Sequence, residues 1–342
     1  MRSRGIYGRK PLDIEVRERD VGSPGFGQVI VKVQACGVCG TDVNLVRDWT
    51  GAHAALGHEI AAEVLEVGPG VTRVAPGDRV IVEDCSMCGT CEKCKTGHPE
   101  LCRSMFSLEG QPGMGEYLVV AHNSLVKFDG LEYPAASLTE PLSVSLTSVL
   151  NADIPLGGSV LVLGNGPLGL MSALLARMRG AGFVAIAARG ADTPMRAARR
   201  KAAEKAGFDM VLTCGSEELP ERVHARFPSG VDRVIVSSPP ASLRDAIALV
   251  RFGGLITFYG LHLGGQNVLP VDVNELIFRK ITLVPTFAEP AVNFPVSLSL
   301  LREGRIDPAA IITHTFGFSS AKGVLQGLVD GTLPAVKPVM VL

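Results

Sequence analysis

The spacing of hydrophobic and polar residues changes near residue 150, and this change divides the chain into two regions. Before it, apolar and polar positions alternate over residues 13–33 and 60–67, with Gly- and Pro-rich turns between the alternating segments. Alternation with a period of two is typical of strands that bury one face. We therefore predict a mostly β N-terminal region, which begins with a hairpin or a barrel-like arrangement around the turn at residues 22–25.

After residue 150, the apolar residues form short continuous runs that alternate with helix-like segments. Runs of this kind are typical of parallel strands that are buried on both faces. Strands that alternate with helices favour an α/β fold with a doubly wound sheet, so we predict a Rossmann domain over residues 151–289. The six predicted strands are residues 159–163, 184–187, 210–212, 234–236, 255–258 and 281–284.

A glycine-rich segment follows the first of these strands and leads into a helix predicted over residues 168–179. Its G-x-G-x-x-G spacing, between a strand and a helix, indicates a dinucleotide-binding loop. The glycines let backbone N–H groups approach a pyrophosphate at the N-terminus of the helix, where the helix dipole favours an anion. The predicted cofactor-binding residues of this loop are Gly164, Gly166, Pro167, Leu168 and Gly169.

The second strand of this region ends without the acidic residue that is typical of NAD binding. In NAD-specific sites, a carboxylate about 20 residues beyond the glycines accepts hydrogen bonds from the ribose 2′-OH. Ala188 takes that position here and Arg189 follows it, while Arg196, Arg199 and Arg200 are expected on the solvated face of a helix. Because the Arg189 guanidinium can bind a 2′-phosphate through paired hydrogen bonds, we predict NADP as the favoured cofactor, with NAD as the alternative.

Five of the eight cysteines lie between Cys85 and Cys102, and clustering of this kind indicates a metal site. Four thiolates close a tetrahedral zinc shell and leave no open position, which makes the site structural. We assign Cys88, Cys91, Cys94 and Cys102 to it and leave Cys85 outside. The alternatives are an iron–sulfur cluster, whose bacterial motif needs a different spacing after Cys94, and a zinc-ribbon recruitment module.

A second set of metal-binding residue types lies nearer the N-terminus, where Cys39-Gly40-Thr41-Asp42 is followed by Gly57-His58-Glu59. A thiolate, an imidazole and a carboxylate all suit zinc, and a catalytic zinc ion typically has three protein ligands and one open position. A further carboxylate, Glu140, lies in a helix predicted over residues 135–150. The sequence therefore predicts a catalytic zinc site on connections of the β region.

The overall composition argues against several classes of function. A net charge of -1 gives no general reason to expect binding to nucleic acid or to an anionic membrane. No apolar run reaches the roughly 20 residues that span a bilayer, and the first residues lack the apolar segment of a secretory signal. We therefore expect a cytoplasmic protein whose partner is a small molecule.

Together these motifs resemble the zinc-containing medium-chain dehydrogenase/reductase (alcohol dehydrogenase) family over essentially the full chain, and most of all its sorbitol, threonine and glucose dehydrogenase branch. The resemblance also rests on Gly77-Asp78-Arg79-Val80 and Glu140-Pro141-Leu142. It implies a GroES-like catalytic domain over residues 1–150, completed by residues 290–342, together with the Rossmann domain.

The resemblance further implies a role for each residue of the two metal sites. Thr41 would relay protons and Asp42 would orient His58. Glu140 would hold the zinc-bound water or replace it, and whether Glu59 or Glu140 binds the ion at rest stays open. The implied metal-site residues are Cys39, His58, Glu59 and Glu140 for the catalytic ion, and Cys88, Cys91, Cys94 and Cys102 for the structural one.

The implied activity is the reversible NAD(P)-dependent oxidation of a secondary alcohol on a polyol, cyclitol or sugar, in a homodimer or homotetramer. Two departures matter. Asn44, which cannot titrate, stands where polyol members usually have a histidine, so the outer proton relay stays open. The segment at residues 49–56, which helps to shape the substrate pocket in the family, is short, so the substrate stays open.

The alternative functions within the family are a threonine-type or simple alcohol dehydrogenase. A zinc-independent enoyl or quinone reductase of the same fold would lack Cys39, His58 and Glu59. A non-enzymatic zinc-binding scaffold would leave the glycine-rich loop and Glu140 unexplained.

Overall fold

The structure is a computed structural model that describes residues 1–215, 218–263, 265 and 267–342. These residues form two compact units. The first comprises Met1–Ser143, Ala288–Asp330 and Lys337–Leu342, and the second comprises Val144–Phe287 and Gly331–Val336. Among the described residues, no helix is both long enough and apolar enough to cross a membrane.

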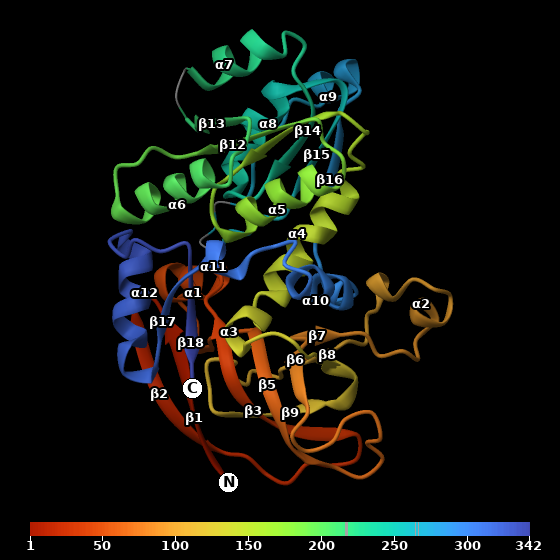
Figure 1. Cartoon of the computed structure of the whole chain (residues 1–342), viewed down its shortest axis with the longest axis vertical. Coiled ribbons are helices and arrows are strands. Elements are labelled where there is room, and N and C mark those ends of the chain that lie inside the picture. The colour runs from red at the N-terminus through yellow and green to blue at the C-terminus, as the bar shows by residue number, and fades with distance from the viewer. Residues whose placement is uncertain (216–217, 264, 266) are drawn as a thin grey trace. The chain divides into compact units, whose positions relative to one another are not determined.

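A seven-stranded sheet forms the centre of the first unit (Figure 1). β3 pairs with β5 along one edge, and with β9 and then β18 along the other edge. The last strand of the chain therefore lies directly beside the end of β3, where the first metal motif begins. The strands of this sheet are β3 (Gln28–Gly37), β5 (Glu59–Val67), β6 (Arg79–Val82), β9 (Tyr117–Ala121), β10 (Leu125–Lys127), β17 (Ile312–Phe316) and β18 (Lys337–Val341).

Two smaller sheets complete the β structure of this unit, and one of them replaces the predicted hairpin around residues 22–25. β2 pairs along its whole length with β1 and not with β3. The prediction missed β1 because its arginines and glycines weaken the strand pattern. The strands are β1 (Arg2–Arg9), β2 (Asp13–Asp20) and β4 (Ala54–Ala55) in one sheet, and β7 (Cys85–Ser86) and β8 (Phe106–Ser107) in the other.

The helices of the first unit are mostly short. The single helix predicted over residues 135–150 is divided into α3 and α4 (Thr139–Asn151), and α4 continues past Ser143 into the second unit. Pro141 lies in the first turn of α4, where a missing N–H is tolerated. The other elements are α1 (Gly40–Asp48), α2 (Glu92–Lys95), α3 (Tyr133–Ala136), α10 (Phe294–Arg302), α11 (Pro308–Ile311), α12 (Ala321–Asp330), and the 3-10 turns η1 (Pro99–Leu101), η2 (His122–Ser124) and η4 (Phe318–Ser320).

The second unit contains the predicted doubly wound sheet, with six parallel strands in the order β13-β12-β11-β14-β15-β16. The strand order reverses direction after β11, and ligands of such sheets bind at the carboxyl ends of the strands near that point. All six predicted strands form. They are β11 (Ser159–Leu163), β12 (Phe183–Ala188), β13 (Met210–Thr213), β14 (Val231–Val236), β15 (Val250–Phe258) and β16 (Thr282–Pro285).

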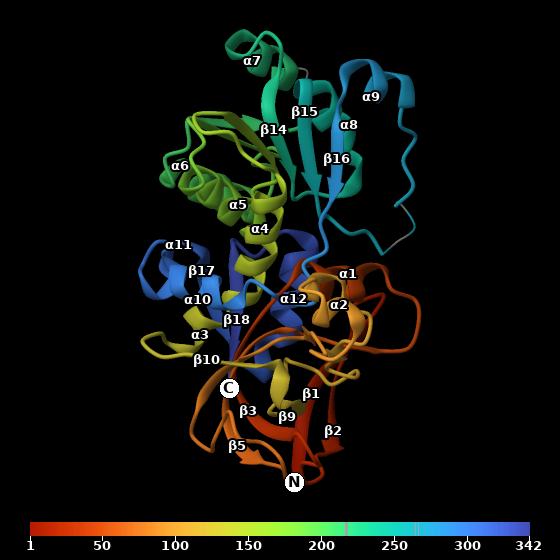
Figure 2. The ribbon, with the colours of Figure 1, turned by 90° about the vertical axis from the view of Figure 1, so that its right-hand side faces the viewer.

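Helices cover both faces of this sheet, with α5 and α6 on one side and α8 and α9 on the other (Figure 2). The strands are continuously apolar because both faces are covered; every residue of β11, for example, is buried. The helices are α5 (Pro167–Met178), α6 (Pro194–Lys205), α7 (Glu218–Arg226), α8 (Leu243–Leu249), α9 (Val273–Arg279) and the 3-10 turn η3 (Pro240–Ser242).

Candidate metal centres and dinucleotide site

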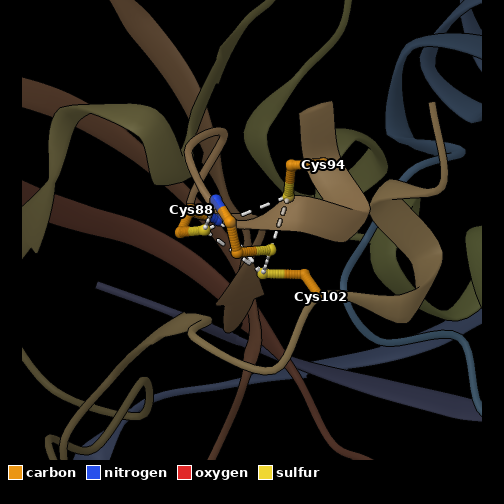
Figure 3. A group of neighbouring side chains, drawn as sticks. Cys88, Cys94 and Cys102 are labelled. Atoms are coloured by element: carbon orange, nitrogen blue, oxygen red, sulfur yellow. Dashed lines mark hydrogen bonds between the residues drawn. The ribbon is translucent and has the colours of Figure 1, made fainter. Parts of the chain in front are cut away.

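The loop between β7 and β8 brings the four assigned cysteines together (Figure 3). Four of the distances between their sulfur atoms lie between 3.5 and 4.0 Å. Four sulfurs bound to one zinc ion at about 2.3 Å in a tetrahedron lie roughly 3.8 Å apart. The spacing of the thiols therefore fits a structural zinc ion.

Hydrogen bonds within the cysteine cluster favour the thiolate form of Cys88, whereas burial raises the pKa of the Cys94 thiol to about 12. The backbone and side chain of Thr90 and the backbone N–H of Cys91 donate to the Cys88 sulfur, and these bonds lower the pKa of the Cys88 thiol to about 6. Cys85 lies outside the cluster, in β7. Burial, together with the negative charge of Asp84, raises the pKa of the Cys85 thiol to about 12.

The candidate catalytic site is built where β3 and β5 meet. Cys39 follows the end of β3, His58 precedes β5, and Glu59 begins it opposite Gly37. The ligand atoms of Cys39, His58 and Glu59 all lie within 4.8 Å of one another. Strand pairing therefore brings together three ligand types that are separated along the chain.

Asp42 joins the two ligand-bearing segments through their backbones. One carboxylate oxygen accepts the N–H of Cys39 at 2.9 Å, and the other accepts the N–H of Gly57 at 2.8 Å. Gly57 has a φ of +87°, and a Cβ there would lie 2.5 Å from the backbone nitrogen of Met114. Glycine is therefore required immediately before His58, and Asp42 fixes the position of that turn.

Negative groups surround the His58 imidazole. Burial by itself would lower its pKa, but Cys39, Asp42 and Glu140 raise it well above the ordinary value. Glu140 is 5% exposed, and burial raises the pKa of its carboxyl group well above the usual range. Glu140 is not part of the group of three residues whose ligand atoms all lie within 4.8 Å of one another. Surroundings that stabilise positive charge fit the binding of a divalent cation.

Sequence reasoning did not identify Lys337 as part of this site. Its ammonium group donates to both carboxylate oxygens of Glu59, at 2.5 and 2.6 Å, and to the carbonyl of Val38 at 2.9 Å. Both side chains are buried. Burial opposes the charge on Lys337, but Glu59 and Cys39 outweigh it and the pKa of Lys337 is raised. Glu59 thus has a fixed cationic partner within the chain.

The polar side chains of α1 nearest the site have identifiable partners. The Cys39 thiol donates to the hydroxyl of Thr41 across 3.7 Å. The Asn44 amide oxygen accepts a hydrogen bond from Arg47 at 2.7 Å, in an exposed position. Asn44 is therefore engaged within the helix by Arg47.

The glycine-rich loop connects β11 to α5 as its motif predicts. Gly164 has a φ of +118°, and Gly166 immediately precedes Pro167, the first residue of α5, with Leu168 after it. A Cβ on Gly169 would lie 1.9 Å from the carbonyl oxygen of Gly164. Close packing of the helix on the strand therefore requires glycine, as it does in dinucleotide-binding loops.

Two arginines lie near this loop. Arg189 is exposed and directly follows β12. Arg199, expected on a solvated face, instead has a guanidinium nitrogen 3.7 Å from the position of a Cβ on Gly166. Burial and then the charge of Arg189 lower the pKa of Arg199 to about 10, and no ion pair within the described part of the chain involves Arg199. An anion at this position would stabilise both charges.

Comparisons with known proteins agree with this geometry. Residues 25–130 match the family model described as "Alcohol dehydrogenase GroES-like domain", and residues 167–302 match "Zinc-binding dehydrogenase". The L-threonine 3-dehydrogenase of Pyrococcus abyssi is 32% identical over 329 residues, covering 92% of this chain and 90% of that protein. The sorbitol dehydrogenase of Gallus gallus is 29% identical over 328 residues, covering 90% and 88%.

A solved structure from Sinorhizobium meliloti, described as a zinc-binding dehydrogenase bound to NADP, superposes with a TM-score of 0.85. It is 26% identical and covers 100% of both chains. With relatives at this identity and coverage, the chain belongs to the zinc-dependent alcohol dehydrogenase family, whose members are oxidoreductases of the alcohol and polyol type.

Proposed function

We propose that this protein catalyses the reversible oxidation of a secondary alcohol on a polyol, cyclitol or sugar, with NADP as the favoured cofactor. The observation that carries the proposal is the convergence of Cys39, His58 and Glu59 to within 4.8 Å. A zinc ion bound there would supply Lewis acidity, which lowers the pKa of a substrate hydroxyl. Bound NADP would accept the hydride. The alcohol loses this hydride and a proton and becomes a ketone.

The residues around the site would then have separate tasks. Asp42 holds the backbones of Cys39 and Gly57 in place. Lys337 holds Glu59, and this supports Glu140 as the carboxyl group that is available to the fourth position. The Thr41 hydroxyl, which contacts the Cys39 sulfur, would pass a proton outward.

The preference for NADP is supported by charge around the glycine-rich loop. Arg189 takes the place next to Ala188, where an NAD-specific site has a carboxylate, and Arg199 lies beside Gly166. Guanidinium groups bind phosphates through paired hydrogen bonds. The relative from Sinorhizobium meliloti, which binds NADP, has a similar fold over its full length.

The proposal is tested by replacing Cys39 with serine. We expect zinc content to fall from two ions per chain to one. Turnover with a reactive secondary alcohol should fall roughly a thousandfold, which corresponds to about 4 kcal/mol of lost transition-state stabilisation. Cys214→Ser, in the second unit and outside both clusters, is the matched control and should change neither quantity. Undiminished turnover in Cys39→Ser would refute the catalytic zinc site.

A second candidate is a substrate whose hydroxyl group lies next to an amino group, as in the L-threonine acted on by the relative from Pyrococcus abyssi. A specific observation favours it: two partly buried carboxyl groups, Asp84 and Glu289, lie together in the first unit, and their oxygens can accept hydrogen bonds from an ammonium group.

A further inference from the structure

A further cluster of metal-ligating side chains lies in the first unit, formed by Asp13, Glu15 and His53, whose ligand atoms are all within 4.8 Å of one another. Asp13 and Glu15 lie on β2, and His53 immediately precedes β4. Neither of the two zinc sites described above uses these residues. The proposed dehydrogenase chemistry therefore leaves this cluster unexplained.

The sheet of β1, β2 and β4 brings the three side chains together. Its strand order is β2-β1-β4, so β1 lies between β2 and the strand that follows His53. Asp13 and Glu15 are two residues apart on β2, and they therefore point to the same face of the sheet. The imidazole of His53 reaches across β1 to this pair. The contact links the segment at residues 49–56 directly to β2.

One nitrogen of the His53 ring lies close to both carboxylates without forming a hydrogen bond. Nε2 is 3.0 Å from Oδ2 of Asp13 and 3.4 Å from Oε1 of Glu15. The side chain of His53 is 8% exposed, and Nε2 is buried and has no hydrogen-bond partner among the described residues. Burial of a polar atom without a partner is unfavourable, so this nitrogen is suited to bind a ligand between the two carboxylates.

The donor atoms of this cluster fit a zinc ion. Nitrogen and oxygen ligands that bind zinc at about 2.0–2.2 Å in a tetrahedron lie roughly 3.4 Å apart, close to the two distances observed here. One imidazole with two carboxylates suits zinc better than magnesium or calcium, which prefer a shell of oxygen ligands. The side chains of Asp13 and Glu15 are partly exposed, so water can complete the coordination.

Two arginines determine how strongly this cluster attracts a cation. Nε of Arg9 donates to Oδ2 of Asp13 at 2.8 Å, and Nε of Arg17 donates to Oε2 of Glu15 at 2.7 Å. The arginines thus leave Oε1 of Glu15 available on the side of His53. Since each carboxylate already has one cationic partner, its attraction for a divalent ion is weaker than that of the four thiolates. We therefore expect an exchangeable ion that dialysis removes.

We propose that Asp13, Glu15 and His53 bind a third, exchangeable zinc ion, which ties the segment at residues 49–56 to β2. His53 and His58 belong to the same connection between α1 and β5, so this ion stabilises the segment that leads to the proposed catalytic ligands. The site lies outside both zinc centres proposed above and does not depend on alcohol oxidation. A proton on the imidazole is the competing occupant, because imidazolium would also compensate the charge of the two carboxylates.

Equilibrium dialysis against zinc chloride tests this site in protein whose other zinc sites are already filled. Wild-type protein should bind one more zinc ion per chain as free zinc rises. This binding should weaken about tenfold or more in His53→Gln and in Glu15→Gln, since loss of even an outer partner of a metal ligand typically costs roughly 10–100-fold in affinity. The matched control is His224→Gln, on α7 of the second unit and outside the clusters found among the described residues, and it should bind zinc as the wild type does.

Calorimetric unfolding distinguishes zinc from a proton on His53. With free zinc a hundredfold above the dissociation constant, the Tm of the wild type should rise by roughly 5–11 °C, whereas that of His53→Gln should not change. Both measurements report bound zinc without turnover, so their failure would leave the proposed dehydrogenase function untouched. Absence of a third ion in the wild type, a third ion that His53→Gln retains with equal affinity, or a wild-type Tm that does not respond to zinc would overturn the inference.

Discussion

Replacement of Lys337 by methionine removes the positive charge from a carboxylate that is fully buried. Glu59 is 0% exposed and Lys337 is 2% exposed, and the ammonium donates to both oxygens of Glu59. The same ammonium also satisfies the carbonyl of Val38. Methionine has a similar length and no donor, so the variant leaves both acceptors buried without this partner.

The expected loss of stability in Lys337→Met follows from the burial of both partners. Breaking a buried ion pair by removing one partner typically destabilises a protein by about 3–5 kcal/mol, because the remaining charge is uncompensated. In a domain of roughly 150–250 residues, each kcal/mol lowers the Tm by about 2–4 °C, so we expect a decrease of roughly 6–20 °C. Replacing both partners, as in Glu59→Gln with Lys337→Met, should cost clearly less, because no isolated charge is left.

The assay is calorimetric unfolding of the single and double variants in a Cys39→Ser background. This background removes a proposed ligand, so that zinc does not take over the free Glu59 carboxylate, and it leaves the cluster from Cys88 to Cys102 intact. If Lys337→Met shifts the Tm by less than about 2 °C, or if the double variant is as unstable as the single one, the pair does not stabilise the site as reasoned here.

Three further predictions concern other parts of the chain. Metal analysis should show that Cys102→Ser loses one zinc ion per chain and that Cys214→Ser loses none. Equal zinc content in the two variants would refute the structural site. Arg189→Ala should weaken NADPH binding by about tenfold or more in a fluorescence titration and leave NADH binding little changed, with Arg200→Ala as the control. Equal weakening of NADPH and NADH binding would reject a role for Arg189 in binding the 2′-phosphate. Burial raises the pKa of Glu83 to about 7, so the folded state binds its proton more tightly than the unfolded state. In urea titrations, Glu83→Gln should match wild type below pH 4.5 and gain up to about 3 kcal/mol as the pH rises through 7; a difference independent of pH would contradict this.

Local sequence was sufficient where one element and its turn carry the information. The strand, glycine loop and helix from β11 to α5 were predictable because the apolar run and the Gly164 turn are local features. The cysteine cluster was predictable for the same reason, since its four residues lie within one loop. The partner of β2 was not, because the weakly patterned β1 competes with β3 for it.

Contacts between distant segments account for what sequence reasoning missed. Lys337 lies 278 residues after its partner Glu59. Only the pairing of β18 with β3 brings the two together. Asp84 and Glu289 meet in the same way, through a segment that returns to the first unit. Residue types at a given spacing predict metal ligands, whereas the charges that surround those ligands depend on the tertiary fold.

The most direct test of the central claim is zinc-dependent reduction of NADP by secondary alcohols. After chelation, the wild-type protein should lose alcohol-dependent NADPH formation, and added zinc should restore it in the wild type but not in Cys39→Ser. Undiminished NADPH formation by the chelated, zinc-free protein would contradict a catalytic metal centre at Cys39, His58 and Glu59.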